Sequence, residues 1–249
     1  MREIEVVELV KRFNDLLVVD GVSFTVDSGE FVCIVGPSGC GKTTLIRMIA
    51  GLEKPDKGCV KIEGEELTSS RKGLYGYVPQ DDALMPWRTV LNNVMLGLEL
   101  MGVDGREAYE RAQEVISMVG LKGFEDYYPH QLSGGMRKRV AIARALAVDP
   151  RILLMDEPFA NIDAQTRWIM QKELMALWSK FKKTVIFVTH NVEEAVYLAD
   201  KVIMLTKRPA RVKREIAIDL PRPRDKLSQP FVKYRERIID MLREEVPEI

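Results

Sequence analysis

The stretch Gly36-Pro-Ser-Gly-Cys-Gly-Lys-Thr-Thr44 decides the fold, because it has the G-x-x-x-x-G-K-[ST] spacing of a phosphate-binding loop. The residues before it, Phe31–Val35, form a continuous apolar run that predicts a buried strand. Apolar spacing after it predicts a helix over Thr43–Ala50, terminated by Gly51. The motif therefore lies between a strand and a helix, which is the context that phosphate binding requires.

Each residue type in this loop has a physical role. Glycines let successive backbone amides converge on an anion, and the helix dipole adds positive potential. Lys42 is expected to bring charge to the β and γ phosphates, and the Thr43 hydroxyl to bind Mg²⁺. A random chain of this length would contain the pattern roughly once in a hundred. The expected nucleotide-binding residues are Gly36, Pro37, Ser38, Gly39, Cys40, Gly41, Lys42, Thr43 and Thr44.

A pair of acids ends the apolar segment Ile152-Leu-Leu-Met-Asp-Glu157. A buried strand with this ending places Asp156 at the carboxyl edge of a parallel sheet, where ligands of open α/β sheets bind. Asp156 is expected to hold Mg²⁺ through its water, and Glu157 to act as a base or polariser for the attacking water. Taken alone, the segment fits a solvated strand end equally well, but the phosphate-binding loop favours the catalytic interpretation.

The composition indicates an ordinary folded chain. Lys and Arg total 37 of the 249 residues and Asp and Glu also total 37, so no net charge favours nucleic acid as a partner. The apolar runs are far shorter than the roughly 20 residues that span a bilayer, and the first residues lack the apolar core of a signal peptide. We expect a cytoplasmic protein.

Three cysteines, Cys33, Cys40 and Cys59, show no metal-ligand spacing and predict reduced thiols. Cys40 is expected to be the most reactive of them, because converging amides and the nearby Lys42 would favour its thiolate.

Apolar periodicity gives the organisation of the chain. Strands are expected at Ile4–Leu9 and Val22–Val26, and a parallel α/β alternation from Ile152 to Leu205. Residues 89–147 carry mainly helical signals, which indicates an inserted helical subdomain. A strand over Val212–Leu220 and a helix from about Ser228 are expected to follow.

The segment Leu132-Ser-Gly-Gly-Met136 separates the classes of P-loop proteins, which include kinases, GTPases and RecA-like motors. With its continuation Arg-Lys-Arg-Val-Ala-Ile-Ala-Arg-Ala-Leu146, it closely resembles the signature of ABC (ATP-binding cassette) ATPases. Ser133, Gly134 and Gly135 also precede a long helix, so they predict exposed amides and a second anion site, with Ser133 as the N-cap.

Further motifs follow in that family's order, and the resemblance covers essentially the whole chain. Gln80 looks like the Q-loop glutamine, which binds Mg²⁺ and takes part in catalysis, and Asp163 looks like the D-loop aspartate. His190 looks like the switch histidine that contacts the γ phosphate, although a lone histidine at a strand end is more often structural. Phe13 fits the aromatic that stacks on adenine, although aromatics near such sites are more often core.

The resemblance implies an α/β P-loop NTPase with a RecA-like parallel core, an antiparallel β lobe and an inserted α-helical lobe. One ABC ATPase domain would cover residues 1–249. Within it, residues 1–84 and 148–206 would form the β lobe and core, 85–147 the helical signature subdomain, and 207–249 a C-terminal strand and helix extension.

The same resemblance implies hydrolysis of ATP to ADP and phosphate with Mg²⁺. A second copy of the chain would pair head to tail, so that each signature covers the other copy's ATP. A membrane permease and, indirectly, a solute-binding protein would be the other partners, which places the chain on the inner face of the cell membrane.

Three features look like the nitrate, sulfonate and taurine import group: Met136 in the signature, Leu84-Met-Pro-Trp-Arg88, and Arg208-Pro-Ala-Arg-Val212 leading to Leu220-Pro-Arg-Pro-Arg-Asp225. The D-loop, Ala160-Asn-Ile-Asp163, departs from the small residue and Leu that many relatives carry. We expect Trp87 to be partly exposed as an anchor for the permease, the alternative being burial in the helical lobe. The basic residues of 207–214 fit either a lipid-facing patch or a solvated hairpin.

Two other functions fit the sequence less well. A non-transport ABC ATPase of DNA repair would carry a long coiled coil between Gln80 and Ser133, where no heptad run occurs, and one of translation would carry two cassettes. A small-molecule kinase leaves the signature unexplained. We therefore expect the motor subunit of an importer.

Overall fold

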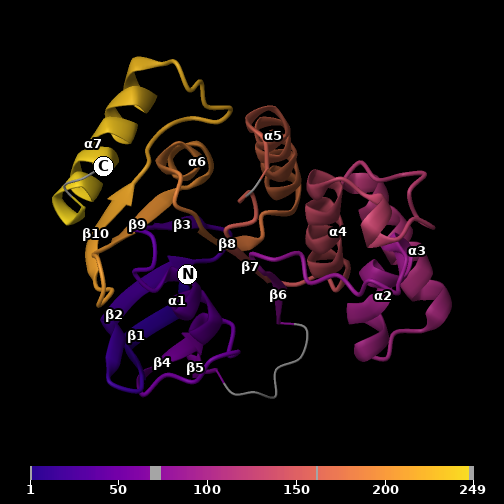
Figure 1. Ribbon diagram of the computed structural model, residues 1–249, viewed down its shortest axis with the longest axis horizontal. Coiled ribbons are helices and arrows are strands. Elements are labelled where there is room, and N and C mark those ends of the chain that lie inside the picture. The colour runs from indigo at the N-terminus through magenta and orange to yellow at the C-terminus, as the bar shows by residue number, and fades with distance from the viewer. Residues whose placement is uncertain (1, 68–73, 161, 247–249) are drawn as a thin grey trace. The chain divides into compact units, whose positions relative to one another are not determined.

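The computed structural model describes residues 2–67, 74–160 and 162–246. They form two compact units (Figure 1). The first unit comprises Met1–Ser70 with Thr184–Ile249, and the second comprises Arg71–Lys183.

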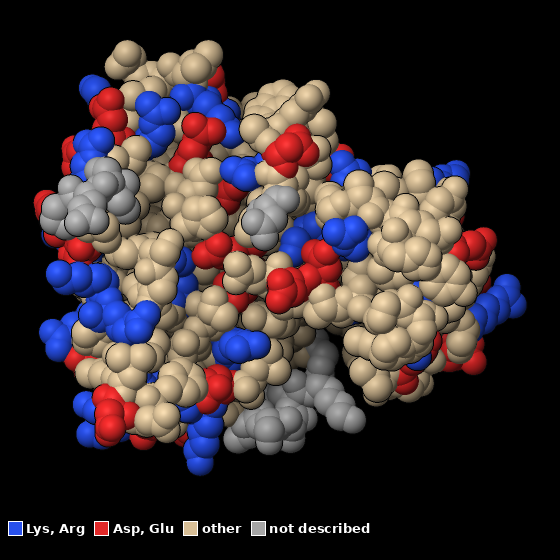
Figure 2. Space-filling view, viewed as in Figure 1, with Lys and Arg blue, Asp and Glu red and all other residues tan. Residues whose placement is uncertain are grey.

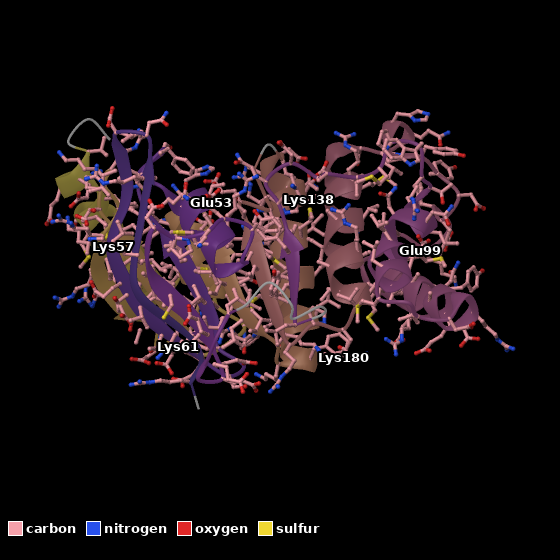
Figure 3. The ribbon with its side chains drawn as sticks, turned by 90° about the horizontal axis from the view of Figure 1, so that it is seen from below. Glu53, Lys57, Lys61, Glu99, Lys138 and Lys180 are labelled. Atoms are coloured by element: carbon pink, nitrogen blue, oxygen red, sulfur yellow. The ribbon has the colours of Figure 1, made fainter. Side chains whose placement is uncertain are left out.

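The first unit contains an antiparallel sheet with the strand order β2-β1-β4-β5. Its strands are β1 (Arg2–Phe13), β2 (Leu16–Asp27), β4 (Lys57–Ile62) and β5 (Glu65–Glu66). Ile4 and Val6 of β1 are buried on one face, and a bulge at Glu8, which has φ 47°, shifts the alternation so that Leu9 is buried as well. Lys57 and Lys61 of β4 are labelled in Figure 3. This sheet is the predicted antiparallel β lobe.

Parallel strands form the second sheet of this unit. The fully buried β3 (Phe31–Val35) lies between β8 (Thr184–Val188) and β9 (Lys201–Leu205), both parallel to it. The antiparallel β10 (Val212–Ala217) pairs with β9. Helices α1 (Lys42–Ile49), α6 (Val192–Leu198) and α7 (Gln229–Glu245) belong to the same unit, and α7 packs on α6.

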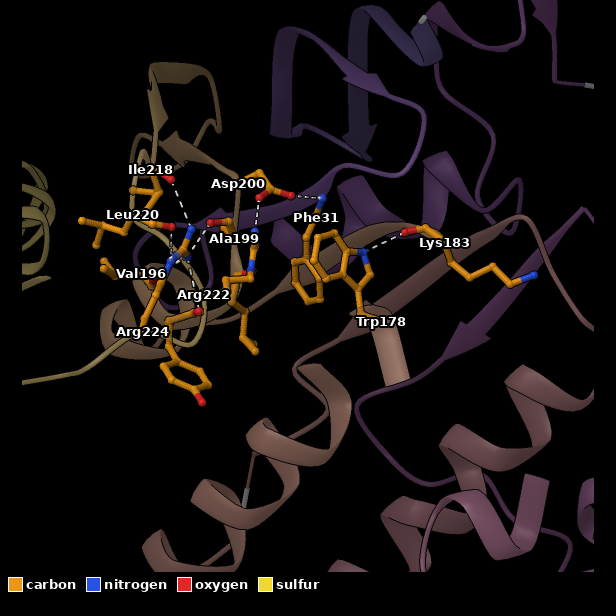
Figure 4. Close-up of polar contacts among 12 residues, drawn as sticks. Phe31, Trp178, Lys183, Val196, Ala199, Asp200, Ile218, Leu220, Arg222 and Arg224 are labelled. Atoms are coloured by element: carbon orange, nitrogen blue, oxygen red, sulfur yellow. Dashed lines mark hydrogen bonds and ion pairs between the residues drawn. The ribbon is translucent and has the colours of Figure 1, made fainter. Parts of the chain in front are cut away.

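Strand β10 ends earlier than its apolar pattern predicts, and a buried arginine binds the carbonyls that follow it. The Arg224 guanidinium donates hydrogen bonds to five backbone carbonyls, those of Val196, Tyr197, Ala199, Ile218 and Leu220 (Figure 4). Burial and the nearby charge of Arg222 lower the pKa of Arg224 to about 10, which leaves it charged at neutral pH. The strand ends at Ala217, opposite Lys201, the first residue of β9, rather than at Leu220, and the carbonyls of Ile218 and Leu220 accept from Arg224 instead.

The second unit combines two parallel strands with helices. The strands are β6 (Tyr75–Val78) and β7 (Ile152–Asp156). The helices are α2 (Val90–Leu100), α3 (Gly105–Met118), the short η1 (Pro129–Gln131), α4 (Gly134–Ala147) and α5 (Ala164–Phe181). Helices α2, α3 and α4 pack on one another (Figure 1), as the helical signals over 89–147 predict.

The charged side chains on the surface are of both signs (Figure 2), as the equal numbers of basic and acidic residues predict. Basic and acidic side chains are interspersed on the face shown in Figure 2. Among the described residues, the helices are all too short or too polar to cross a bilayer.

Candidate nucleotide-binding site

Close packing explains two of the glycines in the phosphate-binding loop. A Cβ on Gly36 would lie 3.1 Å from both the Cys40 Sγ and the Leu205 Cβ. Gly41, with φ 122°, would place a Cβ 3.0 Å from the Val18 Cγ1. The loop therefore requires residues without side chains at both positions, and its backbone can approach an anion closely.

Lys42 lies within the loop. Its ammonium donates to the carbonyl oxygens of Gly36 and Pro37, each at 2.9 Å, and the residue is only 5% exposed. Helix α1 begins at this residue, so the positive end of the helix and the ammonium charge coincide. The arrangement concentrates positive potential where a phosphate would bind.

The expectation that Cys40 is the most reactive thiol is wrong. Cys40 is 1% exposed, and burial raises its pKa although Lys42 acts in the opposite direction. Burial also raises the pKa of Cys33 well above its usual value. Cys59, which is partly exposed on β4, is the most accessible of the three thiols.

His190 follows the carboxyl end of β8, the strand that pairs with β3. The Thr189 amide donates to the Ile34 carbonyl at 3.1 Å, so the chain before His190 lies beside the end of the strand that enters the phosphate-binding loop. The imidazole is exposed. The first unit thus brings the switch-histidine candidate to the same sheet edge as the loop, where α/β sheets bind ligands.

A buried polar clamp holds this segment, and no motif along the chain predicts it directly. The Thr189 hydroxyl donates to the Glu194 carboxylate at 2.6 Å and accepts from the Asn191 amide at 3.0 Å. Both Thr189 and Glu194 are buried. Because the bonds close on either side of His190, they fix the backbone that presents it. The polar spacing Thr-His-Asn-x-x-Glu is the only signal that could have indicated them.

Phe13, the candidate adenine-stacking residue, is 44% exposed at the end of β1. The Lys11 ammonium lies 5.1 Å from the centre of its ring. An exposed ring is available for stacking, which a core position would not allow.

In the second unit, the two candidate catalytic acids, Asp156 and Glu157, lie at the carboxyl end of β7. Asp156 is the buried last residue of the strand. Glu157 follows with φ 44°, a left-handed conformation that costs energy for a residue with a side chain. Strain of this kind is found at functional sites, which supports Glu157 as a candidate.

The donor chemistry fits Mg²⁺. Thr43 offers a hydroxyl oxygen, Gln80 an amide oxygen and Asp156 a carboxylate, and Mg²⁺ prefers hard oxygen ligands with most positions filled by water or phosphate. The described residues contain no group of three or more His, Cys, Asp or Glu side chains that could hold a metal by themselves. A metal bound by these side chains would therefore depend on the nucleotide for much of its coordination.

The loop that carries Gln80 is seated on α4, the signature helix. The Lys138 ammonium, only 3% exposed, donates to the Gln80 carbonyl at 2.7 Å and pairs with Asp82 at 2.9 Å. Arg137 also pairs with Asp82, and Arg144 donates to the Ala83 carbonyl at 2.6 Å. Three cations of one helix thus hold the chain on the carboxyl side of Gln80, while the Gln80 side chain is exposed.

The next segment forms a rigid platform for Trp87. The buried Asn93 side chain donates to the carbonyls of Met85, Arg88 and Thr89 and accepts from the Met85 amide at 2.8 Å. Trp87, between these bonds, is 72% exposed. The expected exposure of Trp87 is confirmed, and burial in the helical lobe is excluded.

The signature begins α4. The Ser133 hydroxyl caps the helix by accepting from the Met136 amide at 3.2 Å, and Ser133 and Gly134 are exposed. A helix leaves its first amides without intrahelical acceptors, so this end can receive an anion. A Cβ on Gly135 would lie 2.9 Å from the Thr166 Cγ2 of α5, which requires glycine there.

Asp163 caps α5 and accepts from the Thr166 amide at 2.9 Å. Hydrogen bonds from Thr166 lower the pKa of Asp163, which keeps it ionised. The signature glycine and the D-loop candidate therefore meet at Thr166. Asn161 of the D-loop lies outside the described residues.

A glycine loop around a buried lysine, set between a parallel strand and a helix, defines a P-loop nucleotide-binding protein. Comparison with known proteins narrows this class. Residues 19–160 match the family model described as ABC transporter. The chain therefore belongs to the ABC transporter family and is one of its ATP-hydrolysing cassettes.

Individual relatives cover nearly the whole chain. An uncharacterized ABC transporter ATP-binding protein of Methanocaldococcus jannaschii is 54% identical over 98% of this chain and 92% of its own length. The nitrate import ATP-binding protein NrtD of Synechocystis is 40% identical over 94% and 91%. The aliphatic sulfonates import ATP-binding protein SsuB of Bacillus cereus is 40% identical over 92% and 90%.

A solved structure has the same fold. A dimeric ATP-binding cassette in a post-hydrolysis state with ADP and phosphate superposes with a TM-score of 0.78 at 34% identity, covering 88% of this chain and all of that one. The predicted fold class, an α/β P-loop NTPase with an antiparallel β lobe and a helical lobe, is confirmed.

Proposed function

We propose that this chain is the motor subunit of an importer for a small solute and that it works by binding MgATP, pairing with a second copy and hydrolysing the nucleotide. The observation that carries the proposal is the Lys42 ammonium held inside the glycine loop by the carbonyls of Gly36 and Pro37. Phosphate oxygens would replace those carbonyls as the partners of Lys42.

The catalytic roles follow from the chemistry of each side chain. Thr43, Gln80 and Asp156 would hold Mg²⁺, with Asp156 acting through water. Glu157 would polarise the attacking water, and its strained backbone supports a functional position. His190, on the clamp of Thr189 and Glu194, would contact the γ phosphate. Phe13 would stack on adenine.

The second copy would complete the site. The exposed amino end of α4, with Ser133, Gly134 and Gly135, is suited to an anion. The phosphate of the partner's ATP would be that anion, in a head-to-tail pair, with Asp163 beside the same interface. The dimeric state of the similar cassette supports this assembly.

A membrane permease would dock at Trp87, and the names of the relatives point to nitrate, sulfonates or a related small solute taken up through it. A solute-binding protein would deliver the solute, and the chain would lie on the cytoplasmic face of the membrane. An exposed Trp on a platform fixed by Asn93 is the kind of rigid aromatic anchor that dominates interfaces.

The test is co-purification with the permease encoded by a neighbouring gene. Trp87→Ala should weaken assembly about thirtyfold, the effect of losing an anchor worth about 2 kcal/mol, while the ATPase rate of the isolated chain stays unchanged. Trp168→Ala, which removes an exposed Trp from α5, is the matched control and should assemble normally. Normal assembly of the Trp87 variant would refute the docking site, and failure of the wild-type chain to bind any permease would refute the importer.

A further inference from the structure

We infer that Arg208 is a positioning residue for the phosphate-binding loop and that the C-terminal extension exists in part to hold it there. The inference rests on the proposed binding of nucleotide phosphate by that loop. It gives a role to Arg208-Pro-Ala-Arg-Val212, a motif that the proposed catalysis does not use.

The contact itself is a two-pronged hydrogen bond. The Arg208 Nε and Nη2 donate to the Gly39 carbonyl oxygen at 3.0 Å and 2.6 Å. Within one peptide group the carbonyl and the amide point in opposite directions. By holding the Gly39 oxygen, Arg208 sets the direction of the Cys40 amide, which donates to the Pro37 carbonyl at 3.3 Å.

The turn that carries Arg208 is fastened to the strand that packs on the same loop. The Ala210 amide donates to the Val18 carbonyl at 2.8 Å, and the Asp20 amide donates to the Ala210 carbonyl at 3.0 Å. Arg211 pairs with Asp20 at 2.5 Å. Because Val18 is also the residue that packs against Gly41, the turn and β2 hold the loop at two glycines, Gly39 and Gly41.

Helix α7 secures the other side of the turn. The Lys207 amide donates to the Glu245 carboxylate at 3.0 Å. Lys213 on β10 pairs with Glu245 at 2.7 Å and with Glu244 at 2.8 Å. The carboxyl end of α7 is therefore tied, through one short turn, to the backbone that would bind phosphate.

Three of the five basic residues in the stretch 207–214 make polar contacts within the chain. Arg208, Arg211 and Lys213 all have partners within the chain. The lipid-facing patch and the solvated hairpin both stay predictions for this stretch, because Arg208, Arg211 and Arg214 are exposed.

Calorimetric titration with MgADP, which requires no dimer, tests the inference. Arg208→Ala should weaken binding about five- to tenfold, Arg208→Lys should recover part of the loss, and Arg214→Ala, which changes an exposed arginine of the same hairpin, should bind like wild type. In steady state, KM for ATP should rise by a similar factor with kcat within twofold, because a loop-positioning residue acts on uniform binding. The three variants should have similar thermal unfolding temperatures.

Equal affinities of Arg208→Ala and Arg214→Ala for MgADP would overturn the inference. The inference would also be overturned if Arg208→Ala lost MgADP affinity together with thermal stability and Arg208→Lys did not restore that affinity. If wild type and Arg214→Ala bind no MgADP, the proposed nucleotide site itself fails, so the two failures are distinguishable.

Discussion

The Lys138 ammonium lies 2.7 Å from the carbonyl oxygen of Gln80, and it is nearly inaccessible to solvent. A buried charge on the signature helix α4 therefore holds the loop that contains Gln80. Lys138→Met should lower the free energy of unfolding by about 1–3 kcal/mol, because it leaves the Gln80 carbonyl without this donor and Asp82 with Arg137 in place of two cations. Hydrogen exchange at the amides of residues 80–83 should rise with it.

Lys122→Met is the control for that variant, since Lys122 is exposed. It should change stability by less than about 0.5 kcal/mol. Exchange at 80–83 that is the same in both variants would show that Lys138 does not hold this loop.

The two ends of β8 offer a matched pair of threonines. Thr189→Val removes the clamp beside His190 and should lower kcat about tenfold while KM stays near the wild-type value, because the clamp positions a catalytic contact. Thr184→Val removes a buried hydrogen bond with Glu3 at the other end and should lower stability without changing kcat. Similar kcat values in the two variants would contradict the positioning role.

Acid should release α7. Hydrogen bonds from Lys213 lower the pKa of Glu245, so the carboxylate is stabilised in the folded chain. A lowered folded pKa gives stability that is present above the unfolded pKa of about 4.3 and is lost as pH falls through the folded value. The effect should be at most about 1 kcal/mol, as for a partly exposed pair.

Hydrogen exchange of α7 between about pH 6 and about pH 3.5, a range that spans the unfolded pKa of Glu, measures this release. In Glu245→Gln, the α7 amides should exchange rapidly already at about pH 6. In Glu236→Gln, which changes an exposed acid on the same helix, the pH dependence of α7 exchange should match that of wild type. If Glu245→Gln and wild type show the same pH dependence of α7 exchange, groups other than Glu245 cause the loss of stability in acid.

Local patterns predict much of the fold. The glycine and lysine spacing of 36–44 and the apolar runs of β3, β7 and β8 identify their elements, because these signals depend on neighbouring residues. The first half of β2 is not predicted, since Asp20 and Gly21 interrupt the apolar pattern and only bulged pairing with β1 keeps them in the strand. A helix is expected from about Ser228, and Ser228 is the N-cap of α7.

The residue types of the site can be predicted, but their structural support cannot. The neighbours of Cys40 along the chain, amides and Lys42, favour a reactive thiol, whereas the folded structure buries the thiol and raises its pKa. Asn93 lies in α2 without a distinguishing pattern, and its four hydrogen bonds depend on how the preceding loop folds back. Neither the burial of Cys40 nor the path of the loop before Asn93 is encoded in a local sequence pattern.

The most direct test of the central claim is the mass of Glu157→Gln in solution with MgATP, measured by light scattering after size-exclusion chromatography. Without its water-polarising carboxylate, the variant should bind ATP, hydrolyse it about 10² to 10⁴ times more slowly and elute as a stable dimer, while wild type dimerises only transiently. A variant that stays monomeric at high protein and ATP concentration, or that hydrolyses ATP at the wild-type rate, would contradict the account of a paired, Glu157-dependent ATPase.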